Sequence, residues 1–192
     1  MNNKGVAANP GGESVVAFSR LMAEAERSGA VEPRLAVLAA IRDGVITGEG
    51  PTTAGRIHFS RSIDALDTAL VGRILLTEAA APITRPEADA LFDIHEAAIE
   101  RLDGGAFDEL FARAIAQHVM AALGQPVPAR ATALATSLAD WAQPVAVDGE
   151  IAAWLKARLN RKRRYDGSIA VLAAWVGATA RSLSTGALDL AA

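Results

Sequence analysis

The chain has no cysteine, few aromatic residues and no long apolar segment, and each absence narrows what it can be. Without cysteine there is no disulfide, no thiolate metal site and no cysteine nucleophile. Five Phe, three Trp and one Tyr are few for a β-rich domain, because strands favour aromatic and β-branched side chains. The longest uncharged stretch in the C-terminal region, Gly167–Ala180, has 14 residues and is too short to span a bilayer.

Alanine dominates what is present, with 43 copies in 192 residues. Alanine is the best helix former, so the composition favours helices. The chain is 51% hydrophobic and 21% charged, which is typical of a globular protein. The first twelve residues contain no apolar core of a signal peptide, and we expect a cytoplasmic protein.

Apolar residues recur at helical spacing along most of the chain and predict an all-α fold, an orthogonal bundle of eight or nine helices. We expect a disordered tail over 1–12, a single helical domain over 13–183 and a loose tail over 184–192. Thr84, Pro86 and Glu87 form a typical capping box with proline in the first turn. The predicted helices cover 13–28, 33–44, 63–75 (capped by Ser62), 85–102, 107–123, 129–141, 151–163 and 169–183, with an ambiguous short helix over 52–60.

An Asp-Gly-x-Ile pattern occurs three times, at 43–46, 148–151 and 166–169. Glycine can adopt the positive φ that ends a helix, and the isoleucine two residues later can start the next. The pattern predicts helical hairpins joined by these turns; a repeated hairpin ancestry is the alternative. It also has the outline of an EF-hand loop, but no copy has an acidic or amide side chain at the other ligand positions.

Motifs of catalysis are absent from the sequence. There is no Gly-x-Ser-x-Gly, no phosphate-binding glycine loop and no His-Glu-x-x-His. Of the histidines, His118 lies beside an apolar stripe and is expected in the core or at its boundary, whereas His95 is expected on a polar face. We expect neither an enzyme nor a bound cofactor.

Two charged segments are candidate binding surfaces. Acidic residues at spacings of four, three and four form a predicted stripe on one helix, and six cations occur within nine residues near the C-terminus. A solvated helix face and a charge-complemented helix end are the plain interpretations. The alternatives are a divalent-ion site or a docking face for a basic partner on the acidic stripe, a phosphate-rich partner for the basic segment, or pairing of the two segments with each other. The acidic residues are Asp89, Asp93, Glu96 and Glu100; the basic residues are Lys156, Arg158, Arg161, Lys162, Arg163 and Arg164.

Four segments resemble the tellurite-resistance TerB proteins and related bacterial all-helical proteins of unassigned function. They are Ile41–Thr47, the helix start Ile83–Ile94, the helix Phe107–Met120 and the closing Trp154-Leu155 unit with Asp166-Gly167, within residues 35–180. The resemblance implies a TerB-like helical bundle and a role in stress responses. It also implies a divalent-metal site, for which Asp43, Glu49, Glu87 and Asp89 are the candidates.

Three functions follow in order of preference. The first is a non-enzymatic helical interaction module that binds a protein partner or a second copy of itself, with the acidic and basic segments as contact surfaces. The second is a divalent-metal-binding module of TerB type. The third, with less support, is nucleic-acid binding by the basic cluster over 156–164.

Overall fold

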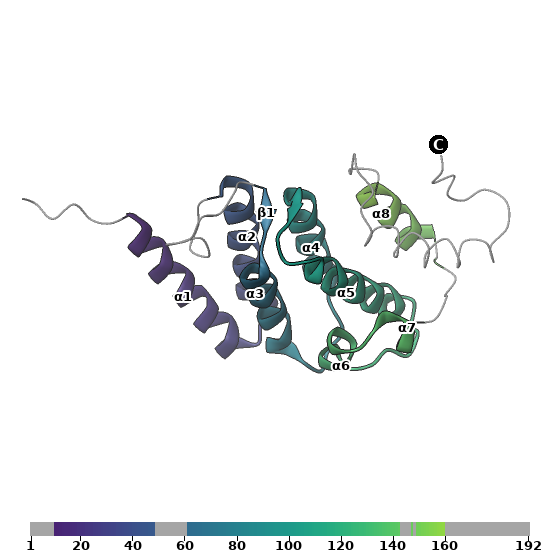
Figure 1. The fold of residues 1–192 in the computed structure, drawn as a ribbon. Coiled ribbons are helices and arrows are strands. Elements are labelled where there is room, and N and C mark those ends of the chain that lie inside the picture. The colour runs from purple at the N-terminus through teal and green to yellow at the C-terminus, as the bar shows by residue number, and fades with distance from the viewer. Residues whose placement is uncertain (1–9, 49–60, 143–146, 148, 160–192) are drawn as a thin grey trace, which may run out of the picture.

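The structure, a computed structural model, describes residues 10–48, 61–142, 147 and 149–159, and this part of the chain is mostly helical (Figure 1). The all-α prediction is therefore confirmed. Two strands of two residues, β1 (Ser62–Ile63) and β2 (Glu100–Arg101), pair in parallel, and a 3₁₀ turn, η1 (Leu76–Glu78), follows α3. The α-helices are α1 (Pro10–Ser28), α2 (Val31–Thr47), α3 (Ala65–Leu75), α4 (Arg85–Ala97), α5 (Ala106–Ala122), α6 (Arg130–Ala135), α7 (Leu138–Trp141) and α8 (Gly149–Leu159).

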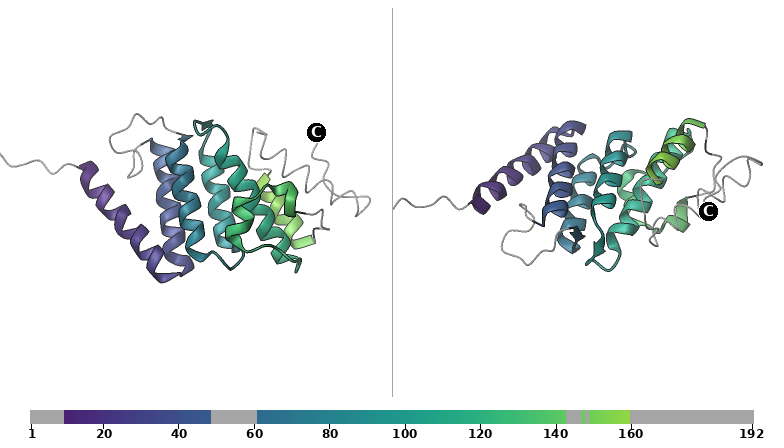
Figure 2. Two further views of the ribbon diagram at one scale, coloured as in Figure 1. Left: turned by 60° about the horizontal axis from the view of Figure 1, so that its bottom comes forward. Right: turned by 90° about the horizontal axis from the view of Figure 1, so that it is seen from above.

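Helix α2 lies at the centre of the N-terminal half, where it packs against α1, α3 and α4 (Figure 2). Helix α5 packs against α3, α4 and the short α6 and α7. Helix α1 is at one edge of the molecule, with most of one side uncovered (Figure 2). None of the described helices is long and apolar enough to cross a membrane.

The start of α4 follows the predicted capping box. The Thr84 side chain accepts a hydrogen bond from the Glu87 backbone N–H, and the Glu87 carboxylate accepts one from the Thr84 backbone N–H. The cap of α3 differs from the prediction. Asp64 caps that helix in a capping box with Asp67, and Ser62 lies in β1 instead. Both residues are polar and near the helix start, and it is the Asp64 side chain that accepts hydrogen bonds from the free backbone N–H groups of Leu66 and Asp67.

The predicted turn at 43–46 is wrong. Helix α2 continues through Gly44 to Thr47 and ends at Gly48, whose φ of +70° is the left-handed conformation that terminates a helix. Val45, one turn after Ile41, extends the buried apolar side of α2 past Gly44, so packing favours continuation. In the second copy Gly149 begins α8, and Asp148 lies outside the described residues, as does the third copy at 166–169.

Three other helix limits also differ from the prediction. Helix α4 ends at Ala97 and not near residue 102, because the chain turns there to pair β2 with β1. The predicted helix 129–141 is two short helices, separated by Thr136 in an extended conformation. Helix α1 begins at Pro10, inside the predicted tail. The predicted segments 52–60, 169–183 and 184–192 lie outside the described residues.

Aromatic side chains from α4, α5 and α8 form the part of the core nearest to the predicted contact surfaces. The Phe92 ring meets Phe111 edge-on at 5.0 Å and Trp154 edge-on at 5.5 Å. His95 is fully buried and stacks on Phe111 at 4.3 Å, so its predicted place on a polar face is wrong. It lies four residues after Leu91 and three after Phe92, in phase with the buried side of α4.

Candidate functional site

The two charged segments predicted as contact surfaces meet inside the chain. Arg158 on α8 donates hydrogen bonds to Asp89 (2.9 Å from Nε) and to Asp93 (2.8 Å from Nη1) on α4. These two aspartates raise the pKa of the Arg158 guanidinium, against the opposing effect of its partial burial. Pairing of the acidic and basic segments, one of the alternatives left open by the sequence, is therefore observed for this arginine.

Trp154 anchors α8 on the same surface. Its indole Nε1 donates to Asp89 at 2.9 Å, and its ring meets His118 of α5 edge-on at 5.3 Å. The Arg85 guanidinium lies 4.0 Å from the centre of the indole ring, in a cation–π contact. Both Trp154 and Arg158 thus direct their polar groups at α4, and α8 covers this part of it.

His118 is buried, as the sequence predicted, and its Nδ1 lies 2.9 Å from the backbone oxygen of Ile83. Burial lowers the pKa of His118 and outweighs the carbonyl of Ile83, which favours the charged form. A neutral imidazole with its proton on Nδ1 satisfies this contact. In this position His118 packs against Trp154 and bonds to Ile83, which lies just before α4.

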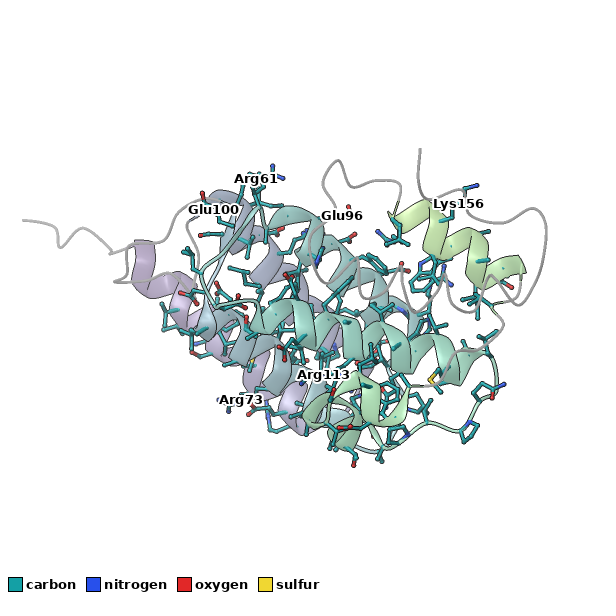
Figure 3. The ribbon with its side chains drawn as sticks, turned by 45° about the vertical axis from the view of Figure 1, so that its right-hand side comes forward. Arg61, Arg73, Glu96, Glu100, Arg113 and Lys156 are labelled. Atoms are coloured by element: carbon teal, nitrogen blue, oxygen red, sulfur yellow. The ribbon has the colours of Figure 1, made fainter. Side chains whose placement is uncertain are left out.

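The remaining predicted contact residues do not form one surface. Lys156 is exposed on the outer side of α8 (Figure 3), and 161–164 lie outside the described residues. Glu96 is half-buried on α4, whereas Glu100 lies in β2 beside Arg61 and is exposed (Figure 3). Because α4 ends at Ala97, the predicted acidic stripe stops before Glu100.

The described candidate metal ligands bond to different partners in the chain and not to one another. Asp43 is exposed and accepts two hydrogen bonds from Arg42, and Asp89 is bonded to Trp154 and Arg158. Glu49 lies outside the described residues. Within the described ranges, no group of three or more His, Asp or Glu side chains could hold a metal ion. The described candidates therefore do not form the predicted cluster.

Glu87, the fourth candidate, is the centre of a buried ionic network. Arg34 of α2 donates to its Oε1 at 2.7 Å, and Arg130 of α6 donates to both oxygens at 3.0 Å. The backbone N–H and the hydroxyl of Thr84 donate to Oε2, each at 2.8 Å. Burial alone would raise the pKa of Glu87, but the bonds from Thr84 and Arg130 outweigh it and lower the pKa.

Arg130 has a hydrogen bond for each of its five N–H groups. Two go to Glu87, and the other three go to the backbone oxygens of Leu75, Ala81 and Pro82. The network joins α2, α4 and α6 to the segment after α3, and its three side chains are almost completely inaccessible. Its position identifies Glu87 as a structural carboxylate that fixes how these helices meet.

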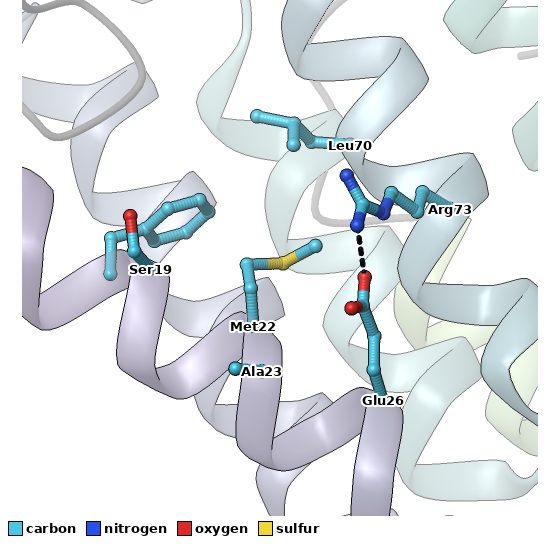
Figure 4. Close-up of a pocket in the computed structure, with 7 residues that line it drawn as sticks. Ser19, Met22, Ala23, Glu26, Leu70 and Arg73 are labelled. Atoms are coloured by element: carbon cyan, nitrogen blue, oxygen red, sulfur yellow. Dashed lines mark ion pairs between the residues drawn. The ribbon is translucent and has the colours of Figure 1, made fainter.

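Helices α1 and α3 form a different kind of surface, with a pocket between them of about 340 Å³ (Figure 4). Phe18 and Met22 on α1 and Leu70 on α3 contribute apolar atoms to its lining, and Ser19, Glu26 and Arg73 contribute polar ones. At one end Glu26 and Arg73 form an ion pair of 2.7 Å across the two helices (Figure 4). The small residues Ser19 and Ala23 line the outer rim on α1.

Four large apolar side chains are exposed on these two helices and on the 3₁₀ turn η1 that follows α3. Val15 and Val16 precede the pocket residues of α1 by about one turn, and Leu66 precedes Leu70 on α3. Leu76 follows Arg73 by three residues. We call the surface made by the pocket and these four residues the α1–α3 face. Exposed apolar groups gathered around a pocket are typical of contact surfaces.

Comparison with known protein families, with curated proteins and with solved structures found no match. The resemblance to TerB proteins and the function it implies therefore remain predictions from the sequence.

Proposed function

We propose that the protein is a non-enzymatic helical interaction module that binds a helix of a protein partner on the α1–α3 face. The pocket between α1 and α3 carries this proposal, because the apolar residues Val15, Val16 and Leu66 are exposed on the same two helices. A partner helix laid over this pocket would cover the exposed groups, which is a common mode of peptide recognition.

The charged surface at α4 supports the proposal less well than the sequence suggested. Asp89 and Asp93 already bind Arg158, and Trp154 covers the same part of α4. A basic partner would have to displace these internal contacts before it could dock. The α1–α3 face has no such internal competitor among the described elements, and four of its apolar residues, Val15, Val16, Leu66 and Leu76, are already exposed.

A small-molecule ligand fits the pocket less well than a protein side chain does. Ligand pockets combine apolar walls with a few polar groups that converge on the ligand. Here the two charged groups, Glu26 and Arg73, are bonded to each other at 2.7 Å. The pocket opens to solvent beside the exposed residues Ser19 and Ala23, which suits small apolar side chains of a helix.

Photo-crosslinking at residue 23 in cells that express the chain tests the proposal. A photoreactive amino acid at Ala23 should yield a discrete crosslinked protein, and the same group at Ala153, on the exposed side of α8, should not. The crosslink should disappear when Val16→Glu or Leu66→Glu places a charge on the α1–α3 face. It should persist with Ile99→Glu, which changes an exposed apolar residue elsewhere.

Equal crosslinking at residues 23 and 153 would contradict the proposal, as would a crosslink at residue 23 that neither face variant reduces. Each variant should first be shown to be folded by circular dichroism. Val16, Leu66 and Ile99 are 51%, 45% and 57% exposed, so the three changes are matched in their expected small effect on stability.

A further inference from the structure

Both polar anchors of α8 converge on one oxygen atom of α4. The Oδ1 of Asp89 accepts a hydrogen bond from the Trp154 indole at 2.9 Å and another from the Arg158 Nε at 2.9 Å. Arg158 also donates to Asp93. Because the two anchors share one acceptor, a change that displaces Trp154 also disturbs the bond from Arg158.

His118 of α5 lies against the first of these anchors. Its ring meets the Trp154 ring edge-on at 5.3 Å, and the two side chains are only 7% and 8% exposed. The indole therefore helps to shield the imidazole from water, and burial is the largest cause of the lowered pKa of His118. Removal of Trp154 from this position would expose the imidazole and return its pKa towards the ordinary value.

The charged groups around His118 do not offset its burial. Arg85, whose guanidinium lies 4.0 Å from the centre of the same indole ring, disfavours a second positive charge there. Glu87 and Asp89 favour the charged imidazole, but both carboxylates already bind arginines. These arginines are Arg34 of α2 and Arg130 of α6 at Glu87, and Arg158 of α8 at Asp89. Protonation of His118 thus adds a positive charge where the carboxylates are already paired.

We infer that His118 is an acid-sensitive release for α8: protonation of its imidazole displaces Trp154, loosens Arg158 with it, and frees α8 from α4. A proton binds the released form more tightly than the packed one, so acid shifts the equilibrium towards release. Release also leaves Asp89 and Asp93 accessible, which makes the acidic side of α4 available to a basic partner at low pH.

The pH range of the release follows from His118 alone. The effect begins near pH 6.5, the ordinary pKa of histidine, and grows until the pH has fallen below the lower pKa of the packed form. This inference concerns the contact between α4 and α8 and goes beyond the proposed function, which concerns the α1–α3 face. Either can be overturned without the other.

Hydrogen exchange of the purified full chain at pH 7.5 and pH 5.5 tests the release. After correction for the chemical pH dependence of amide exchange, the amides of 149–159 should exchange about 3- to 10-fold faster at pH 5.5. The local exchange of α1, at the opposite edge of the molecule, should not change, because opening there does not expose His118 (Figure 1). The range ends at pH 5.5 because carboxylates ordinarily titrate near pH 4.

His118→Asn tests whether the imidazole is the group that titrates. Asparagine keeps a side-chain donor for the oxygen of Ile83 but has no charge to gain. In this variant the exchange rates of 149–159 at the two pH values should agree to within about 2-fold. An acid acceleration that persists in this variant would overturn the inference.

Arg85→Met tests the role of the neighbouring positive charge. Without it the pKa of His118 in the packed form should rise, and the ratio of the two exchange rates should fall. The lost cation–π contact loosens α8 at both pH values, so the ratio is the readout and not either rate. Arg73→Met, on α3, is the matched control and should keep the wild-type ratio. Equal ratios in the two methionine variants would remove Arg85 from the release.

Three results in the wild type would overturn the inference. The first is an exchange rate of 149–159 that is the same at pH 7.5 and pH 5.5. The second is slower exchange in acid, which would show that the indole stabilises the imidazolium. The third is exchange of 149–159 only through unfolding of the whole chain, because His118 can lower the global stability without releasing α8.

Discussion

The Glu87 carboxylate and the Arg130 guanidinium, 43 residues apart in the chain, form a two-bonded ion pair that is inaccessible to solvent. Arg34 adds a third contact, so one buried anion is shared by two cations. The second positive charge is stabilised by backbone oxygens around Arg130 and by the oxygen of Gly29 at the end of α1, which accepts from Arg34. Three helices thus depend on one carboxylate for their relative positions.

Glu87→Gln should destabilise the fold strongly. The change leaves two buried guanidinium groups without their counter-ion, and breaking a buried ion pair in this way costs about 3–5 kcal/mol. Urea denaturation followed by circular dichroism would measure the loss in the free energy of unfolding. Glu109→Gln is the matched control, because Glu109 pairs with Arg113 on the surface and its loss should cost less than about 1 kcal/mol.

Acid should remove the stabilisation that Glu87 provides. Its pKa is lowered from the ordinary value of 4.5, so the contribution is fully present above pH 4.5 and is lost as the pH falls through the folded-state pKa. The difference in unfolding free energy between the wild type and Glu87→Gln should therefore be largest near neutrality and shrink below pH 4.5. A difference that stays constant from pH 7 to pH 3 would contradict the lowered pKa.

Of the contacts around Glu87, the sequence predicted the local one, the capping box with Thr84. Thr84 and Glu87 are three residues apart, and a capping box is encoded by that spacing alone. The partners Arg34 and Arg130 are 53 and 43 residues away, and no local pattern links them to Glu87. The resemblance to TerB proteins made Glu87 a candidate metal ligand, whereas in the structure its charge is balanced by Arg34 and Arg130.

A signal for the buried charges was nevertheless present. Arg34 is four residues before Leu38 and seven before Ile41, and Glu87 is four before Leu91, so both lie in phase with buried apolar stripes. A charged residue on such a stripe indicates a paired, buried group. The same phase argument places His95 in the core. Helix ends were harder to predict, since the end of α4 at Ala97 is set by the pairing of β2 with β1, a contact between distant segments.

His118 should make stability depend on pH in a higher range than Glu87 does. Burial lowers its pKa below the ordinary value of 6.5, so the unfolded chain binds a proton more readily than the folded one just below pH 6.5. The free energy of unfolding should fall as the pH is lowered from 6.5 through the folded-state pKa. An NMR titration of the imidazole gives that pKa directly, and a midpoint at or above 6.5 would contradict the prediction.

Substitution by asparagine isolates this effect. His118→Asn retains a side-chain donor for the oxygen of Ile83 but does not titrate. Its unfolding free energy should change less than that of the wild type between pH 6.5 and pH 5. Both proteins should still lose stability below pH 4.5, because both retain Glu87 and its lowered pKa.

Helix α8 should loosen when Arg158 is replaced. Arg158→Met removes the bonds to Asp89 and Asp93 but keeps most of the aliphatic length of the side chain, so Trp154 becomes the main anchor of α8 on α4. Because the pair is partly accessible to solvent, we expect a modest loss of about 1–2 kcal/mol. Hydrogen exchange of the amides in 149–159 should become about 5- to 30-fold faster, which is the same change expressed as an opening equilibrium.

Lys156→Met on the same helix is the matched control for this prediction. Lys156 is exposed on the outer side of α8 and, within the described part of the chain, forms no ion pair, so its replacement should leave exchange in 149–159 unchanged. High salt should accelerate exchange in the wild type only slightly, because Arg158 is 13% exposed and its bonds to the aspartates are short. Equal acceleration by the two methionine variants would show that α8 is held by helix propensity or by general charge. It would contradict the assignment of Arg158 as the residue that fixes α8 to the acidic side of α4.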